Sequence, residues 1–225
     1  MNIISTSGRT CIMRITILGG TGYAGAELVR EAAARGHEVT SFSRSAAETP
    51  VDGVRYVHGS ALEEAELAPA LEGAEVVVSA LAPRGPLAGR TRELLAGVAD
   101  TVAASGVRLG VIGGAGSLQV AEGGPLLVDT PDFPEAFRAE AREMTAVLDD
   151  LRGRDDQLDW FFVSPAAGFG AHAPGSARGQ FRIGSDVLLA DENGASELSA
   201  PDLASAILDE IEAPAHRRAR FTVAY

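Results

Sequence analysis

A turn with three regularly spaced glycines, between an apolar segment and a helical segment, constrains this chain more than any other feature. Residues 15–18 are mostly apolar, Gly19, Gly22 and Gly25 follow at three-residue intervals, and residues 26–35 have a helical pattern. A strand, a glycine turn and a helix in this order form a dinucleotide-binding unit. The first glycine allows the tight turn, the second lets the backbone approach the pyrophosphate, and the third lets helix and strand pack closely. The phosphates bind at the helix N-terminus, where unpaired N–H groups favour negative charge. An ordinary glycine-rich turn is the alternative, and the strand and helix that flank this turn argue against it.

Strand and helix segments alternate along the rest of the chain, which predicts an α/β fold with a Rossmann-like, doubly wound parallel sheet of about seven strands. The strand segments are 15–18, 38–43, 54–59, 75–81, 107–112, 159–163 and 220–225, with a further short strand at 187–191. The helical segments are 26–35, 62–71, 87–104, 134–152 and 199–211. We expect Pro69 to bend or divide the second helix. We expect residues 13–225 to form a single domain with a small C-terminal substrate lobe at about 165–200, and residues 1–12 to be a disordered extension.

Charge and residue counts exclude several classes of function. The net charge of −12 argues against nucleic acid or an anionic membrane as the partner, so we expect a small-molecule ligand. All 19 basic residues are arginines, which excludes a Schiff-base lysine and a Walker-type phosphate lysine. Cys11 is the single cysteine, so we predict no intrachain disulfide and no metal site. No segment approaches the roughly 18 apolar residues of a membrane span, and no signal peptide is recognisable, so we expect a cytoplasmic location.

The end of the second predicted strand indicates which dinucleotide is bound. In this fold an acidic residue at that place binds the ribose 2′-hydroxyl, whereas an arginine accommodates a 2′-phosphate. Here the sequence is Ser43-Arg44-Ser45, with no acid. We therefore predict a preference for NADP(H) over NAD(H), and the alternative is a solvated surface arginine.

The spacing G-x-x-G-x-x-G, written Gly-Gly-Thr-Gly-Tyr-Ala-Gly at 19–25, resembles the atypical and extended short-chain dehydrogenase/reductase families. The aromatic strand followed by Ser164-Pro165-Ala166 is similar to the pattern of NmrA-like proteins, and the flavin/biliverdin reductase-like group is equally close. The resemblance covers residues 13–225. Together with the strand ends, it implies a set of residues that contact the cofactor. These are Gly19, Thr21, Gly22, Tyr23, Gly25, Ser43, Arg44, Ser60, Ala61, Ala80, Leu81, Ala82, Gly113, Ser164, Pro165 and Ala166.

The usual catalytic pair of the resembled enzymes, Tyr-x-x-x-Lys on the helix at 134–152, is missing. The positions in phase with it are Phe137 and Ala141, which cannot do acid–base chemistry. Two weak catalytic candidates remain: Ser117, the hydroxyl nearest the end of the fifth strand, and His172. The charged residues of this helix, Glu140, Arg142 and Glu143, fit a solvated face.

Two arginines of the C-terminal segment, Arg178 and Arg182, are further candidates. Each could hold an acidic substrate or the 2′-phosphate of the cofactor.

Three functions fit these features to different degrees. An NADP(H)-dependent reductase without the Tyr–Lys pair can serve a flavin, quinone or similar conjugated acceptor, because the proton then comes from water or a weak donor. A non-catalytic, NmrA-like NADP(H)-binding redox sensor is the alternative. A sugar-nucleotide epimerase or dehydratase fits least, since those reactions need the tyrosine base. A homodimer is possible, although no helix face stands out as its interface.

Overall fold

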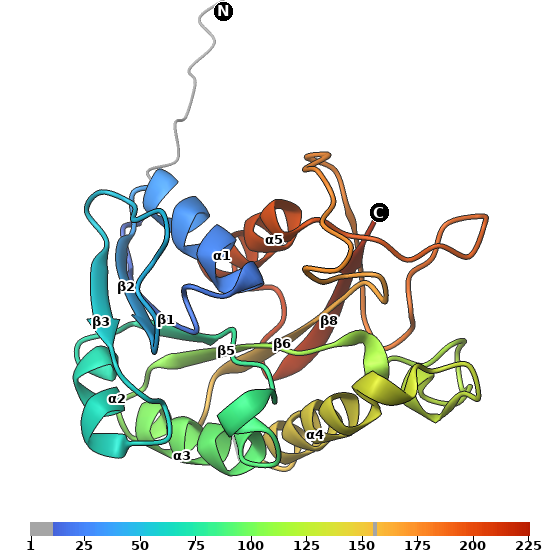
Figure 1. Cartoon of the computed structure of the whole chain (residues 1–225), viewed down its shortest axis with the longest axis horizontal. Helices are drawn as coiled ribbons and strands as arrows, with labels where there is room; N and C mark the ends of the chain where they lie inside the picture. Colours follow the sequence, from blue (N-terminus) through green and yellow to red (C-terminus); the bar gives the residue numbers. More distant parts are fainter. Residues whose placement is uncertain (1–10, 155–156) are drawn as a thin grey trace, which may run out of the picture.

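The computed structural model describes residues 11–154 and 157–225. Its centre is an eight-stranded sheet in the order β3-β2-β1-β4-β5-β6-β8-β7 (Figure 1). The strands are β1 (Arg14–Leu18), β2 (Glu38–Ser43), β3 (Arg55–His58), β4 (Val76–Ser79), β5 (Arg108–Ile112), β6 (Trp160–Pro165), β7 (Arg182–Gly184) and β8 (Ala219–Ala224). All neighbouring strands are parallel except β7, which runs antiparallel to β8. The predicted doubly wound α/β fold is confirmed. The extension predicted at residues 1–12 lies almost entirely outside the described residues.

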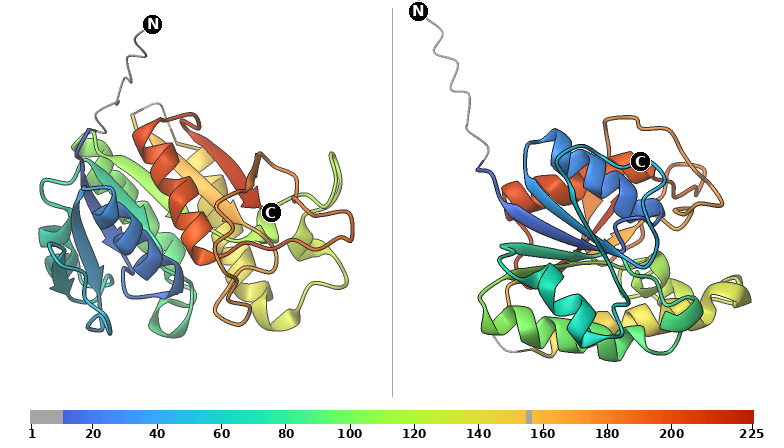
Figure 2. Two further views of the ribbon diagram at one scale, coloured as in Figure 1. Left: turned by 90° about the horizontal axis from the view of Figure 1, so that it is seen from above. Right: turned by 60° about the vertical axis from the view of Figure 1, so that its left-hand side comes forward.

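Five α-helices in the described part of the chain cover both faces of the sheet. They are α1 (Tyr23–Ala34), α2 (Glu64–Leu71), α3 (Thr91–Ala104), α4 (Glu135–Arg152) and α5 (Ala200–Glu212). Helices α1 and α5 lie on one face, and α2, α3 and α4 lie on the other (Figures 1 and 2). None of these helices is long and apolar enough to cross a membrane.

Alternate residues of each central strand enter two separate hydrophobic cores. In β1, Ile15 and Ile17 belong to the core beneath α1 and α5, whereas Leu18 belongs to the core on the opposite face. The hydroxyl of Thr16 is buried and donates to the carbonyl of Ala70 at 2.7 Å, so this polar group is satisfied. Burial on both faces explains why the central strands have few polar residues.

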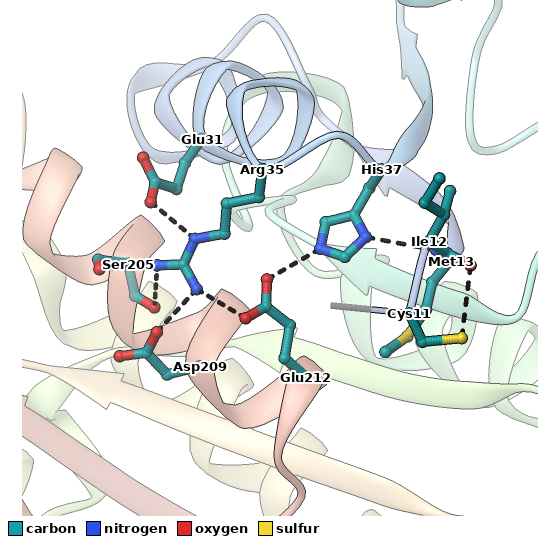
Figure 3. A network of polar contacts seen from close by, with 9 residues as sticks. All are labelled: Cys11, Ile12, Met13, Glu31, Arg35, His37, Ser205, Asp209 and Glu212. Atoms are coloured by element: carbon teal, nitrogen blue, oxygen red, sulfur yellow. Dashed lines mark hydrogen bonds and ion pairs between the residues drawn. The ribbon is translucent and has the colours of Figure 1, made fainter. Parts of the chain in front are cut away.

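An ion-pair cluster joins the C-terminal end of α1 to α5 (Figure 3). The guanidinium of Arg35 donates to Glu31 at 2.8 Å and, across to α5, to Asp209 at 2.7 Å and Glu212 at 3.2 Å. Glu212 also accepts from His37 at 3.0 Å, while Nδ1 of His37 accepts from the Met13 N–H at 3.3 Å. Since Nδ1 is an acceptor, the imidazole proton is on Nε2. The cluster lies near the amino ends of β1 and β2, away from the strand ends that form the site described below.

The structure corrects or narrows three local predictions. The strand predicted at 187–191 is absent, because the backbone of Leu188 donates to Gln119 rather than to the sheet. The edge of the sheet is instead β7, in a segment predicted to be loop. Of the bend or division expected at Pro69, the division is excluded, because α2 is one short helix with Pro69 inside it. The helix predicted from residue 87 begins at Thr91, after a 3₁₀ turn at Gly85–Leu87.

Candidate active site

The turn between β1 and α1 has the geometry that its glycines predict. Gly19 has φ of +83°, a left-handed conformation that L side chains rarely adopt. A Cβ on Gly25 would lie 2.1 Å from the carbonyl oxygen of Gly19, so only glycine lets helix and turn approach this closely. Gly22 is the N-cap of α1 and no side chain caps the helix. The first-turn N–H groups are therefore available to an anion. This arrangement fits the pyrophosphate of a dinucleotide.

A cavity of about 590 Å³ opens beside this turn. It lies at the carboxyl ends of the six strands β1 to β6. The strand order reverses between β1 and β4, which are neighbours in the sheet. Open α/β sheets bind ligands at this edge. Most of the residues predicted to contact the cofactor line this cavity. They are Gly19, Thr21, Gly22, Tyr23, Ser43, Arg44, Ser60, Ala61, Ala80, Leu81, Ala82, Gly113, Pro165 and Ala166. Fourteen positions from six strand ends thus converge on one cavity.

Arg44 follows β2 directly and lines the cavity. Its side chain is exposed and makes no hydrogen bond or ion pair with any residue in the described ranges. The neighbouring Ser43 hydroxyl donates to the carbonyl of Ser45 at 2.8 Å, which fixes this turn. An unpaired guanidinium at this place is free to bind an anionic group.

The other end of the cavity is apolar and aromatic. Helix α4 contributes Phe137, Ala141 and Met144. The segment before α4 contributes Phe133, and the segment after β6 contributes Phe169. The ring of Phe169 also packs against Tyr23, with centroids 5.4 Å apart. Phe137 and Ala141, the positions in phase with the Tyr–Lys pair of the resembled enzymes, both line the cavity.

Tyr23 is the only tyrosine among the cavity-lining residues. Burial, and after it the nearby charge of Glu27, raises the pKa of its phenol. It belongs to the glycine turn, not to α4, so it does not replace the missing tyrosine base.

Three of the predicted site residues do not line the cavity. Gly25 lies behind the turn that it allows to close. Ser117 and Ser164 are buried, and both hydroxyls accept from Nη1 of Arg220, at 3.1 Å and 3.3 Å. Arg220 also donates to Asp186 at 2.8 Å. The interpretation of Ser117 as a catalytic hydroxyl therefore loses its geometric support, whereas His172 does line the cavity.

The two C-terminal arginines considered as anion ligands also lie elsewhere. Arg178 pairs with Glu197 at 3.1 Å and stands 3.8 Å above the ring of Tyr225. Arg182 donates to the backbone oxygen of Tyr225 at 3.0 Å. Neither lines the cavity.

The charged face of α4 was wrongly predicted to be simply solvated. Glu140 lines the cavity and accepts from Nε of Arg84 at 2.6 Å. Glu143 accepts from the backbone N–H groups of Gly89 and Thr91, both at 2.7 Å, ahead of α3. The helical spacing of Phe137, Glu140 and Ala141 was the signal that could have placed Glu140 at the site.

Comparison with known proteins defines the class of this chain. The sequence profile of the NAD(P)H-binding family matches residues 19–214, and the chain belongs to this family. The predicted membership of an NAD(P)H-binding family is confirmed. The uncharacterized protein YwnB of Bacillus subtilis is 36% identical over 219 residues, covering 94% of this chain and 98% of YwnB.

Three solved structures share the fold over nearly their whole length. A proposed exported protein from Burkholderia pseudomallei is 39% identical with a TM-score of 0.83, covering 95% of this chain and 100% of its own. A proposed epimerase from Bacteroides thetaiotaomicron is 32% identical with a TM-score of 0.85, and the match covers 96% of this chain and 98% of the epimerase chain. A proposed NADH-flavin reductase from Streptococcus pneumoniae is 31% identical with a TM-score of 0.75, and the match covers 94% of this chain and 99% of the reductase chain.

Proposed function

We propose that this protein is an NADP(H)-dependent reductase that delivers hydride to a flavin, a quinone or a similar conjugated acceptor. The observation that carries the proposal is one continuous cavity with two unlike ends. One end is a glycine turn at a helix N-terminus, and the other is largely aromatic and lacks the Tyr–Lys pair. The similarity to the proposed NADH-flavin reductase of Streptococcus pneumoniae supports the same reaction class.

Arg44 supports NADP(H) as the preferred cofactor. Its guanidinium carries five N–H donors and no partner from the described residues competes for them. A 2′-phosphate would gain charge-assisted hydrogen bonds there, whereas NAD(H) offers only a hydroxyl. The net charge of −12 repels anions at long range, so a local cation is needed to hold this phosphate.

The bound cofactor would supply a hydride from its nicotinamide ring. The chain's own residues would position the partners and exclude water. Ala80, Leu81 and Ala82 after β4, with Pro165 and Ala166 at the carboxyl end of β6, border the cavity with backbone and apolar side chains. Phe137 and Phe133 offer flat apolar surfaces on which a conjugated ring can stack. Proximity of two held reactants is the main catalytic contribution that this arrangement can make.

The proton for the acceptor needs no strong acid in this site. A reduced flavin or quinone takes its proton from water readily, so His172, which lines the cavity, is not required as a donor. A ketone or a sugar nucleotide would need the tyrosine base. The lack of one on α4 disfavours the epimerase reaction, although a relative is described as a proposed epimerase.

A non-catalytic NADP(H) sensor of NmrA-like type is the second candidate function. The absence of the Tyr–Lys pair among the cavity-lining residues fits that function equally well. In both cases we propose a protein of the cytoplasm that acts on small molecules without nucleic acid or membrane as partner. The homodimer and the NmrA-like subgroup stay predictions, and one relative is described as a proposed exported protein.

Steady-state oxidation of NADPH separates the two functions. The purified protein is mixed with NADPH and, in turn, riboflavin, FMN and a panel of quinones, while the nicotinamide absorbance is followed against a protein-free control. Turnover of any acceptor supports the reductase. Tight NADPH binding with no oxidation across the panel supports the sensor.

A further inference from the structure

Two charged side chains stand out in the apolar end of the cavity. Arg84, in the segment after β4, and Glu140, on α4, both line it. Nε of Arg84 donates to Oε2 of Glu140 at 2.6 Å. The side chain of Arg84 is 66% exposed and that of Glu140 is 25% exposed, so the pair lies at the rim of the cavity with its cation toward solvent.

Most of the donor capacity of Arg84 is unused. A guanidinium has five N–H donors in a fixed plane, and only the one on Nε bonds to Glu140. The two terminal nitrogens make no hydrogen bond to the described residues of the chain. Their parallel N–H bonds match the two oxygens of a phosphate or a carboxylate. Arg84 can therefore keep its bond to Glu140 and still bind an anion.

The pair lies next to the aromatic surface on which an acceptor would stack. Phe137 and Glu140 are three residues apart on α4, so their side chains leave the same side of the helix, with Cβ atoms about 5–6 Å apart. Glu140 consequently holds the guanidinium roughly one helical turn from the ring of Phe137. A ligand with a flat ring and an anionic arm would meet both groups at once.

We propose that Arg84 binds an anionic group of the acceptor, and that Glu140 is the residue that positions Arg84. The acceptor class is then a planar conjugated compound with a phosphate or carboxylate arm, an assignment that rests on the proposed reductase function. A local cation is needed here for the same reason as at Arg44, because the chain as a whole is strongly acidic. In this proposal the two arginines serve different ligands: Arg44, after β2, binds the 2′-phosphate of the cofactor, and Arg84, after β4, binds the acceptor.

FMN and riboflavin test this assignment, because they share the ring system and differ in one phosphate. The dissociation constant of each is measured by quenching of flavin fluorescence on the protein saturated with NADP⁺, which requires no turnover. We expect FMN to bind more tightly than riboflavin. Arg84→Gln should raise the dissociation constant of FMN by at least about tenfold, the effect of a hydrogen bond to a charged group, and that of riboflavin by less than about twofold.

Two further variants separate the local contact from general charge effects. Arg142→Gln is the matched control. Arg142 lies on α4, the helix of Glu140, and its side chain is 58% exposed. It pairs with Asp129 at 3.1 Å and does not line the cavity. This variant should leave the ratio of the two flavin dissociation constants unchanged. Glu140→Gln keeps an oxygen for Arg84 and removes a negative charge beside the anion, so FMN should bind about two- to fivefold more tightly.

The proposal is overturned if Arg84→Gln changes the dissociation constants of both flavins equally, or changes neither. It is also overturned if the unaltered protein binds FMN and riboflavin equally tightly, or binds neither. A loss of NADPH affinity in Arg84→Gln larger than the loss for FMN would assign Arg84 to the cofactor and also overturn it. If the FMN preference depends on Arg84 but no acceptor oxidises NADPH, the anion site stands and the reductase function falls.

Discussion

The ring of Phe137 on α4 lies against the imidazole of His172 from the segment after β6, with centroids 5.9 Å apart and planes inclined by 25°. Both residues line the cavity, and Phe137 keeps 40% of its surface exposed. The contact joins two segments that are far apart in sequence at the apolar end of the site. If the proposed function is correct, the acceptor stacks on the part of the Phe137 ring that stays exposed.

Replacing Phe137 should weaken acceptor binding while leaving the cofactor in place. Phe137→Ala removes a stacking surface worth about 1–1.5 kcal/mol, so the KM for riboflavin should rise several-fold. The dissociation constant for NADPH, measured by fluorescence titration, should stay within about twofold of the unaltered protein. Val120→Ala, also at an exposed apolar residue but outside the cavity, is the control. An unchanged KM in Phe137→Ala would remove this residue from the acceptor site.

His172 should prove dispensable for proton supply. Because a reduced flavin takes its proton from water, we expect His172→Gln to lower kcat with riboflavin by less than about threefold and to leave the shape of its pH profile intact. A fall of about a hundredfold or more, with loss of one limb of the profile, would instead show that His172 is the proton donor.

The close contact between α1 and the glycine turn makes Gly25 the most sensitive position of the cofactor site. Gly25→Ala would place a methyl group 2.1 Å from the carbonyl oxygen of Gly19, so the turn must shift. We expect NADPH to bind at least about tenfold more weakly, or about 1.4 kcal/mol. Gly97→Ala in α3 is the matched control, because its new methyl group meets nothing within 4 Å. That variant should bind NADPH normally and gain about 0.5–1 kcal/mol in unfolding free energy.

The preference for NADP(H) should depend on Arg44. Arg44→Gln removes the cation next to the expected 2′-phosphate, so the affinity for NADPH should fall about tenfold, or 1.4 kcal/mol, while that for NADH stays nearly constant. Arg55→Gln, which makes the same charge change at the amino end of β3, should alter neither affinity. Equal losses for both cofactors in Arg44→Gln would contradict the assignment.

Acid should destabilise the fold partly through Glu210 on α5. Burial raises the pKa of this carboxyl, but hydrogen bonds from Arg108 at 2.6 Å and from His216 outweigh it, so the net pKa lies below the ordinary 4.5. A lowered pKa means that the ionised group stabilises the folded state above about pH 4.5. This contribution is lost as the pH falls through the lower, folded pKa.

Glu210→Gln tests that account by urea unfolding at several pH values. The variant leaves buried Arg108 without its closest counter-charge and should lose about 3 kcal/mol at neutral pH. Its unfolding free energy should also fall less steeply with acid than that of the unaltered protein. Glu48→Gln, at an exposed loop residue, should match the unaltered protein at every pH. Parallel pH curves for Glu210→Gln and the unaltered protein would show that Glu210 is not responsible.

The cofactor end of the site could be predicted from sequence because it is made by local signals. Gly19 to Gly25 form one turn, and Arg44 is fixed by its place directly after a strand. The acceptor end depends on contacts between distant segments. Arg84 and Glu140 are 56 residues apart, and nothing in the sequence of α4 indicates that an arginine lies opposite.

Distance along the chain also explains why the surroundings of Ser117 could not be predicted. Its partner Arg220 lies 103 residues later, on a strand whose neighbours in the sheet could not be read from its own sequence. The edge strand β7 was missed because its three residues, Arg182–Gly184, carry too short an alternation to be distinguished from loop.

A single-turnover experiment without oxygen tests the central claim most directly. The protein is saturated with NADPH and mixed with one equivalent of riboflavin, while the nicotinamide and flavin absorbances are followed together. The reductase account predicts that both bands decrease at the same rate, much faster than in the absence of protein, because one hydride leaves the nicotinamide and enters the flavin. If NADPH binds but both bands decay no faster than in the protein-free mixture, and quinones give the same result, the protein is not a reductase of this class.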